Sequence, residues 1–122
     1  SKAFYLVELP TTRRPVQVRK TSFPPCDEPI LRLTKVNHWP LLDDSITVSL
    51  NQTGEGEISL PFNNNISRME IYEPTLLEFE LLCNGERIAV SEVIQLPSVQ
   101  EDPMIRVPLK SYSEIKGWYY QK

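Results

Sequence analysis

Hydrophobic and polar residues alternate with a period of two in short segments along this chain. Residues 46–50 alternate apolar and hydroxyl side chains, residues 77–81 place two glutamates between three apolar residues, and residues 105–109 alternate apolar residues with Arg and Pro. This period is typical of a β-strand that buries one face and exposes the other to water. Eleven prolines, spread from Pro10 to Pro108, leave few windows in which a helix could run. The pattern therefore predicts an all-β fold.

We expect eight strands from residue 30 onward and two further extended segments ahead of them. The eight are residues 30–36, 45–51, 57–62, 68–73, 76–83, 86–96 with a break near Ser91, 104–109 and 117–121, and the earlier two are residues 3–9 and 16–20. Strands spaced by about 8–12 residues predict a β-sandwich or a barrel.

Turn residues separate the predicted strands. Asn84-Gly85, between two apolar runs, is the strongest hairpin signal, and residues 51–56, with one Asn and two Gly, also indicate a hairpin loop. A helix over residues 75–96 is the alternative that we disfavour, because Gly85 interrupts it and residues 77–81 alternate as a strand does.

Composition narrows the class of protein without naming an activity. With 122 residues, 40 % of them hydrophobic and 24 % charged, the chain has the size and polarity of one globular domain. The net charge of −3 argues against nucleic-acid binding, which requires phosphate neutralisation. The charge is unevenly distributed, because residues 1–40 hold seven Lys or Arg against three Asp or Glu, and the remaining residues hold six against thirteen.

The cysteines and two short motifs bear on the cellular compartment. Two cysteines in a chain of this size are a weak disulfide signal, and the sequence leaves open whether Cys26 and Cys83 pair. Asn51-Gln52-Thr53 and Asn65-Ile66-Ser67 match the acceptor pattern for N-glycosylation. Because no signal-peptide pattern opens the sequence, we interpret both matches as incidental. We expect a reducing, cytoplasmic location, with association to the cytoskeleton or to a membrane as further options.

Several segments match the pattern of a known family. Residues 30–37 (Ile-Leu-Arg-Leu-Thr-Lys-Val-Asn) look like the first strand and first loop of a C2 domain, and residues 77–81 look like its fifth strand. Gly117-Trp118-Tyr119-Tyr120 resembles the closing strand. The chain thus resembles, from residue 29 to 121, the eight-stranded antiparallel C2 sandwich best known from membrane-targeting modules. The resemblance implies an N-terminal extension over residues 1–28, with one or two added strands, and a C2-like β-sandwich over residues 29–122.

The residues at the expected ion- and lipid-binding positions depart from the C2 pattern. Calcium takes about six to eight oxygen ligands, which C2 domains supply from aspartates of the first and third loops. The first loop here offers Asp43 and Asp44, but the third-loop equivalent offers only Asn84 and Glu86. The third and fourth strands hold one Arg and three Glu in place of a lysine-rich face. We therefore expect no metal, no other cofactor and no phosphoinositide binding at that face.

Residues 38–42 (His-Trp-Pro-Leu-Leu) form the most conspicuous apolar cluster outside a predicted strand. Trp39, Leu41 and Leu42 are candidates to enter a membrane or to fill a pocket of a protein partner, because Trp anchors both kinds of interface. The alternative is that Trp39 and Leu41 cap the end of the sandwich core. The sequence leaves open whether this loop is buried or exposed.

A basic cluster near the N-terminus is the second candidate site. It consists of Arg13, Arg14, Arg19 and Lys20. We expect residues 3–9 to dock on the sandwich and to hold this cluster as one basic strip, suited to an acidic protein partner or to anionic lipid headgroups. The alternative is that these charges protect an edge strand from pairing with another sheet.

The sequence contains no catalytic constellation. It has one His, no G-x-S-x-G motif, no phosphate-binding loop and no Cys or His spacing typical of zinc. We expect a non-catalytic, calcium-independent C2-like domain that acts as a protein–protein interaction or scaffolding module of a larger protein. The alternatives are a peripheral membrane domain that binds anionic phospholipid, and an immunoglobulin-like or adhesin sandwich, which a Cys26–Cys83 disulfide would favour. The partner's identity and the oligomeric state stay open.

Overall fold

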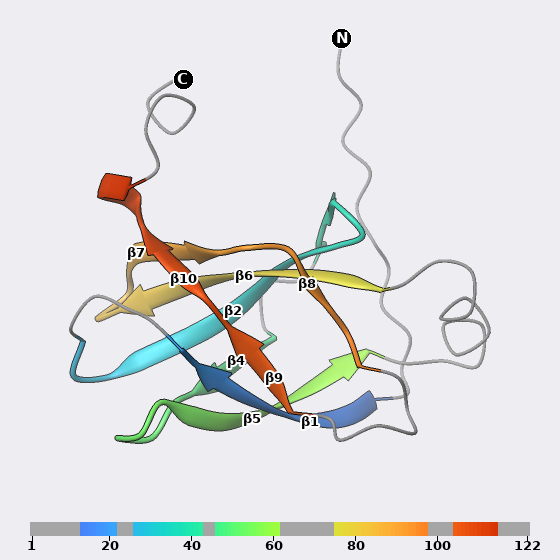
Figure 1. The fold of residues 1–122 in the computed structure, drawn as a ribbon, viewed down its shortest axis with the longest axis horizontal. Helices are drawn as coiled ribbons and strands as arrows, with labels where there is room; N and C mark the ends of the chain where they lie inside the picture. Colours follow the sequence, from blue (N-terminus) through green and yellow to red (C-terminus); the bar gives the residue numbers. More distant parts are fainter. Residues whose placement is uncertain (1–12, 22–25, 43–45, 62–74, 98–103, 115–122) are drawn as a thin grey trace, which may run out of the picture.

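The computed structural model describes residues 13–21, 26–42, 46–61, 75–97 and 104–114, and these residues form two β-sheets (Figure 1). The strands are β1 (Arg13–Lys20), β2 (Pro29–Val36), β3 (Trp39–Pro40), β4 (Thr47–Ser49), β5 (Glu55–Pro61), β6 (Leu76–Cys83), β7 (Glu86–Ser91), β8 (Ile94–Gln95), β9 (Ile105–Val107) and β10 (Leu109–Ser111), followed by a 3₁₀ turn, η1 (Tyr112–Glu114). The smaller sheet has the order β5-β1-β9. The larger has the order β10-β7-β6-β2-β3, with β4 paired to β2 and β8 paired to β6.

The two sheets share one hydrophobic core, as expected of a β-sandwich. Alternate residues of β1, β2, β5, β6 and β9 point into it, and Phe79 is its largest fully buried side chain. Its members include Val16, Val18, Leu31, Leu33, Ile58, Leu60, Leu77, Phe79, Leu81, Ala89, Ile105 and Val107. Burying each large apolar side chain stabilises the fold by about 1.5–3 kcal/mol before entropy is counted. The prediction of an all-β, two-sheet architecture is confirmed.

β1 is the middle strand of the smaller sheet. It runs antiparallel to β5 along most of its length and parallel to β9, where Val18 lies opposite Ile105. The segment that we assigned to an N-terminal extension therefore contributes to the common core, and the reading of β1 as a protected edge strand is wrong. The parallel pair also departs from the expected all-antiparallel sandwich.

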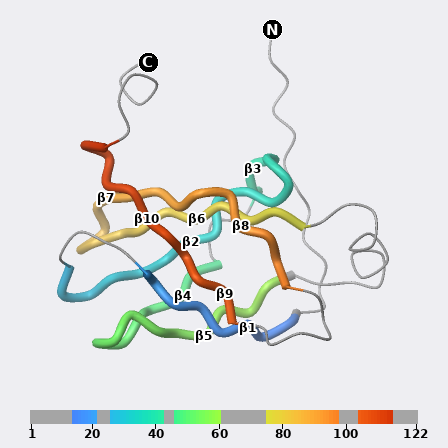
Figure 2. Tube along the Cα trace, in the orientation of Figure 1, coloured from blue at the N-terminus to red at the C-terminus, as the bar shows by residue number. Residues whose placement is uncertain are grey.

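The segment that contains β9 and β10 contributes to both sheets. β9 pairs with β1 in the smaller sheet, and β10 pairs with β7 in the larger one, with Pro108 between them. Pro108 has no N–H to donate to either ladder. Its carbonyl accepts a hydrogen bond from Glu92 N at 3.3 Å. The chain thus crosses between layers at this point, as the tube in Figure 2 shows.

The two predicted turns have different outcomes. Asn84 and Gly85 join β6 to β7 with φ values of 54° and 81°, the positive pair typical of a two-residue hairpin, so that prediction is confirmed. The hairpin predicted at residues 51–56 is wrong, because β4 pairs with β2 and β5 pairs with β1. Both strands point apolar residues into the same core, and the turn between them carries the chain from one sheet to the other.

The break predicted near Ser91 is confirmed. β7 ends at Ser91, and β8 resumes the pairing with β6 at Ile94. At the break, the Ser91 hydroxyl oxygen accepts a hydrogen bond from Phe79 N at 2.7 Å, where a regular ladder would offer a carbonyl. The expected strands at residues 3–9, 68–73 and 117–121 lie outside the described residues, so the eight-strand C2 arrangement stays a prediction.

Candidate functional site

The β2–β3 hairpin is a fixed projection at one end of the larger sheet. Asn37 and His38 form its turn with φ values of 50° and 70°, and Val36 lies opposite Trp39. The Asn37 backbone N–H donates to Leu76 O at 2.8 Å, and the Asn37 side-chain oxygen accepts from Leu76 N at 2.7 Å. These two bonds fasten the turn to β6, so the residue that follows it is held in place.

The hairpin presents apolar side chains to solvent. Trp39 is 43 % exposed and Leu42 is 61 % exposed, whereas Leu41 packs against the core. The Leu41 backbone N–H also donates to Thr34 O at 3.0 Å. Of the two residues considered as caps of the core, Leu41 therefore fits that role better than Trp39. The sequence left open whether this loop is buried or exposed, and the structure exposes it at Trp39 and Leu42. We call these two residues the apolar tip.

The basic cluster is divided between the two faces of β1. Arg14 and Lys20 lie on the core-facing side and Arg19 lies on the opposite, exposed side. Arg14 Nη1 donates to Pro97 O at 2.9 Å, and Lys20 is only 4 % exposed. The side chain of Arg13 is outside the described part of the structure. Arg14, Arg19 and Lys20 therefore do not form the expected single basic strip. The period of two in a strand places residues 14 and 20 on one face and residue 19 on the other, so the sequence could have predicted this division.

The buried position of Lys20 makes its ammonium group easier to deprotonate. Its backbone N–H donates to Gly54 O at 2.8 Å, and its side chain packs beside Gly54. Burial disfavours the charged ammonium and lowers the pKa of Lys20 from 10.5 to about 8. On the other side of β1, Arg19 lies opposite Glu55 in register, and Gln17 donates to Glu57 Oε2 at 2.7 Å. The exposed face of the smaller sheet is therefore mixed in charge.

The larger sheet carries an open groove of about 330 Å³ on its outer face. Strands β2, β6 and β7 form its floor, and η1 contributes Tyr112 to its wall. Its lining consists of Thr34, Lys35, Glu78, Phe79, Glu80, Arg87, Val90, Ser91 and Tyr112. None of these residues was a candidate site in the sequence, because the groove exists only when three strands and the 3₁₀ turn lie together.

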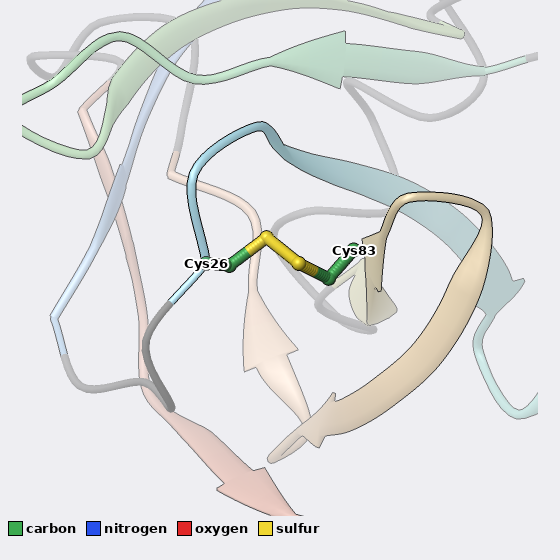
Figure 3. The surroundings of a disulfide bond; sticks show 2 residues. All are labelled: Cys26 and Cys83. Atoms are coloured by element: carbon green, nitrogen blue, oxygen red, sulfur yellow. A yellow bond between two sulfur atoms is a disulfide. The ribbon is translucent and has the colours of Figure 1, made fainter.

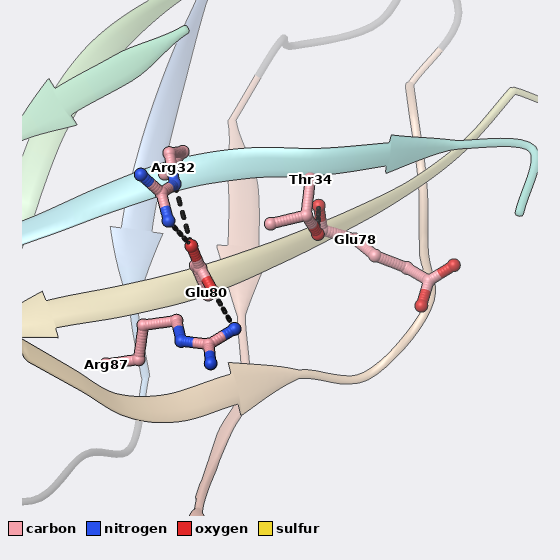
Figure 4. Close-up of polar contacts among 5 residues, drawn as sticks. All are labelled: Arg32, Thr34, Glu78, Glu80 and Arg87. Atoms are coloured by element: carbon pink, nitrogen blue, oxygen red, sulfur yellow. Dashed lines mark hydrogen bonds and ion pairs between the residues drawn. The ribbon is translucent and has the colours of Figure 1, made fainter. Parts of the chain in front are cut away.

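Glu80 is buried in the floor of this groove. Arg32, directly opposite on β2, donates to Glu80 Oε1 through Nη2 and through Nε, the latter at 2.7 Å (Figure 4). Arg87 Nη1, on β7, lies 3.8 Å from Glu80 Oε2. The glutamate is 5 % exposed, so our expectation that it lay on an exposed face is wrong. Long arginine side chains on both neighbouring strands cover its carboxylate and offset its charge.

Glu78 connects the groove to the hairpin. Its side chain points away from Glu80 (Figure 4), and Glu78 Oε2 lies 3.3 Å from His38 Nδ1, an ion pair when His38 is protonated. The Thr34 hydroxyl donates to the Glu78 backbone carbonyl at 3.0 Å. Arg87, with 60 % of its side chain exposed, offers a guanidinium group on the β7 side of the groove. Such a surface can recognise a peptide through hydrogen bonds and charge pairing.

A disulfide closes the opposite end of β6. Cys26, just before β2, is bonded to Cys83, the last residue of β6, with a Cα–Cα distance of 5.9 Å (Figure 3). Pro29 lies opposite Cys83 in the β2–β6 ladder, so the bridge extends a pairing that the strands already make. The pairing of the cysteines, which the sequence left open, is thereby established in this structure.

Within the described ranges, no group of three or more His, Cys, Asp or Glu side chains is placed to hold a metal ion, and no helix is long and apolar enough to cross a membrane. The candidate loop acids Asp43 and Asp44 lie outside those ranges. Comparison with known proteins found no matching family model, no matching curated protein and no matching solved structure. The C2 resemblance and calcium independence accordingly stay predictions.

Proposed function

We propose that this chain is a non-catalytic interaction domain that binds a protein partner through the apolar tip and the adjoining groove. The observation that carries the proposal is the 43 % exposure of Trp39 on a hairpin whose turn is fixed to β6 by two hydrogen bonds. Trp is enriched among the residues that dominate binding energy at protein interfaces. A segment whose backbone is held in position before binding loses less conformational entropy in the complex.

The groove supports recognition more than catalysis. Its buried carboxylate, Glu80, is already paired with arginines, and the hydroxyls of Thr34 and Ser91 bond to backbone groups. The charges at the groove are the exposed Lys35 and Arg87 and the half-buried Glu78. They have both signs, which suits a polypeptide with alternating charge better than a uniformly anionic lipid surface. A calcium-independent, C2-like scaffolding role remains part of this proposal.

The disulfide bears on where the domain works. Disulfides persist in oxidising compartments and are rare in the reducing cytoplasm. We therefore place the proposed function in an oxidising compartment, in preference to the cytoplasmic location expected from the sequence. The Cys26–Cys83 bridge was the feature that would favour an immunoglobulin-like or adhesin sandwich. An extracellular binding domain of that kind is the alternative to the C2-like module, and the disulfide supports this alternative.

The test compares Trp39 with a matched exposed residue on another segment. Val93 is 47 % exposed and lies between β7 and β8. A photo-cross-linking residue at Leu42 should capture the partner, and the same residue at Val93 is the control that should not. Affinity is then measured for the wild type, Trp39→Ala and Val93→Ala. We expect Trp39→Ala to weaken binding by about 30-fold, the effect of about 2 kcal/mol, and Val93→Ala by less than about twofold.

Two outcomes would contradict the proposal. Equal affinities of the Trp39→Ala and Val93→Ala variants would show that the apolar tip is not the binding surface. Co-sedimentation with vesicles containing anionic phospholipid, lost in Trp39→Ala and absent with neutral vesicles, would establish the peripheral membrane alternative instead.

A further inference from the structure

The Asn51-Gln52-Thr53 motif occupies an exposed β-turn between β4 and β5. Gly54 N donates to Asn51 O at 2.9 Å, which closes the turn, and Asn51 N donates to Glu55 O at 2.8 Å. The side chains of Asn51, Gln52 and Thr53 are all exposed. The acceptor tripeptide for N-glycosylation therefore lies in the folded domain on a protruding turn, where an attached oligosaccharide has room.

The oxygen and the nitrogen of the Asn51 side-chain amide differ in their hydrogen bonds. Its oxygen, Oδ1, accepts from Thr53 N at 3.0 Å and from Glu55 N at 2.9 Å. The Thr53 hydroxyl lies 2.7 Å from the same oxygen and 2.8 Å from Glu55 Oε1, so its single proton is shared between them. The side-chain oxygen thus shapes the turn. Among the described residues no hydrogen-bond acceptor is recorded for Nδ2, the nitrogen to which a glycan is attached.

The disulfide supplies an independent argument about the compartment. N-glycans are added in the secretory pathway, the same oxidising environment in which a Cys26–Cys83 bridge forms and persists. The sequence alone led us to treat the motif as incidental because no signal-peptide pattern opens it. The disulfide now gives separate support for a secretory compartment.

We propose that Asn51 is an N-glycosylation site and that the domain carries an oligosaccharide on the β4–β5 turn. The donor is a lipid-linked oligosaccharide diphosphate. A bond forms between Asn51 Nδ2 and C1 of the first sugar, while the bond between C1 and the diphosphate oxygen breaks. The lipid diphosphate leaves with the electron pair, and the amide nitrogen loses one of its two protons to a base of the transferase.

The position of this glycan is compatible with the proposed binding surface. Leu50 N donates to Pro29 O at the start of β2, whereas Trp39 lies opposite Val36 at its end. An eight-residue strand separates these two points by roughly 23 Å at about 3.3 Å per residue. The oligosaccharide would therefore shield the disulfide end of the larger sheet and leave the apolar tip accessible.

The experiment expresses the full chain behind a cleavable secretion signal in eukaryotic cells. Asn65→Gln is introduced first, because residues 65–67 form the second motif. In this background we expect one oligosaccharide, removable by peptide-N-glycosidase. Cleavage in heavy-oxygen water should place the isotope label on residue 51. Asn51→Asp and Thr53→Ala should lose the glycan completely, and Thr53→Ser, which keeps the hydroxyl, should retain it.

Asn51→Asp also separates modification from folding. A carboxylate keeps the oxygen acceptor that holds the turn but lacks the amide nitrogen, so this variant should melt at the temperature of unglycosylated protein with Asn51 intact, made in a bacterial periplasm where the disulfide can form. A secreted, disulfide-bonded protein with unmodified Asn51 would overturn the proposal. So would a glycan that persists in Asn51→Asp, because it would then be attached elsewhere. Neither result would bear on binding through Trp39.

Discussion

The Cys26–Cys83 disulfide carries the largest single effect on stability that we predict. The two cysteines are separated by 57 residues, and closing a loop of that length removes roughly 14 cal/mol/K from the unfolded chain, or about 4 kcal/mol at 25 °C. For a chain of 122 residues, an unfolding entropy of about 2.1 cal/mol/K per residue converts 1 kcal/mol into about 4 °C. We expect Cys26→Ser/Cys83→Ser to lower the free energy of unfolding by about 2–4 kcal/mol and Tm by about 8–16 °C.

Removing the disulfide acts mainly by raising the entropy of the unfolded state. The folded chain keeps its strand pairing without the bridge. Pro29 and Ile30 lie opposite Cys83 and Leu82 in the β2–β6 ladder, next to the point where the disulfide is attached. The double variant should therefore retain the circular dichroism spectrum of the wild type at 20 °C. Its denaturant m-value should rise, because an unfolded chain without the cross-link exposes more surface.

Thermal and urea unfolding of four samples tests this reasoning. These are the wild type and the double variant, each with and without dithiothreitol. Reduction should bring the wild type to the Tm of the double variant and should leave the double variant unchanged. Two titratable thiols in the unreduced wild type, or a Tm that reduction does not lower, would refute the role assigned to the disulfide.

Three further predictions concern residues whose setting only the structure shows. Glu80→Gln leaves two arginines without their counter-charge and should lower the free energy of unfolding by about 1.5–3 kcal/mol. Arg87→Gln removes an exposed side chain and leaves the Arg32–Glu80 pair in place, so it should cost less than about 1 kcal/mol; equal losses in urea unfolding would contradict this. Because the pKa of Lys20 is lowered to about 8, the unfolded chain binds more protons than the folded one between that pH and 10.5, and the free energy of unfolding should rise with pH across this window. Lys20→Met should lack that rise, and identical pH dependence in the two proteins would refute the assignment. A Cβ on Gly56 would lie 2.7 Å from a valine methyl carbon and 2.8 Å from a backbone oxygen, so Gly56→Ala should cost about 3 kcal/mol. Gly85→Ala, with φ +81° and open space around it, should cost about 1–2 kcal/mol from backbone strain, and a reversed order of the two melting temperatures would show that the clash is relieved.

Local patterns in the sequence were sufficient for the elements themselves. The alternation over residues 76–83 predicts β6 with the bounds that the structure shows, Leu76–Cys83. Asn84-Gly85 predicts the hairpin that follows, because few other dipeptides adopt positive φ twice in succession. Each of these features depends on residues within one strand or one turn, where the period of two and the backbone preferences of Asn and Gly act directly.

Partners across the fold could not be predicted in this way. Arg32 and Glu80 lie 48 positions apart in the sequence, each as a charged residue between apolar ones. No pattern within either segment indicates that their two strands pair in this register. For the same reason the turn at residues 51–56 was mistaken for a hairpin, since the alternation of β4 and β5 is the same whether they share a sheet or face each other across a core.

The sequence by itself therefore determined the all-β class, the strand alternation, the β6–β7 hairpin and the motif around Asn51. Only the tertiary structure decided that β1 lies in the middle of a sheet, that Glu80 is buried, that Trp39 is exposed and that Cys26 meets Cys83. Backbone propensity and side-chain periodicity act over a few residues, whereas register, burial and cross-linking depend on segments that folding brings together from distant positions in the chain.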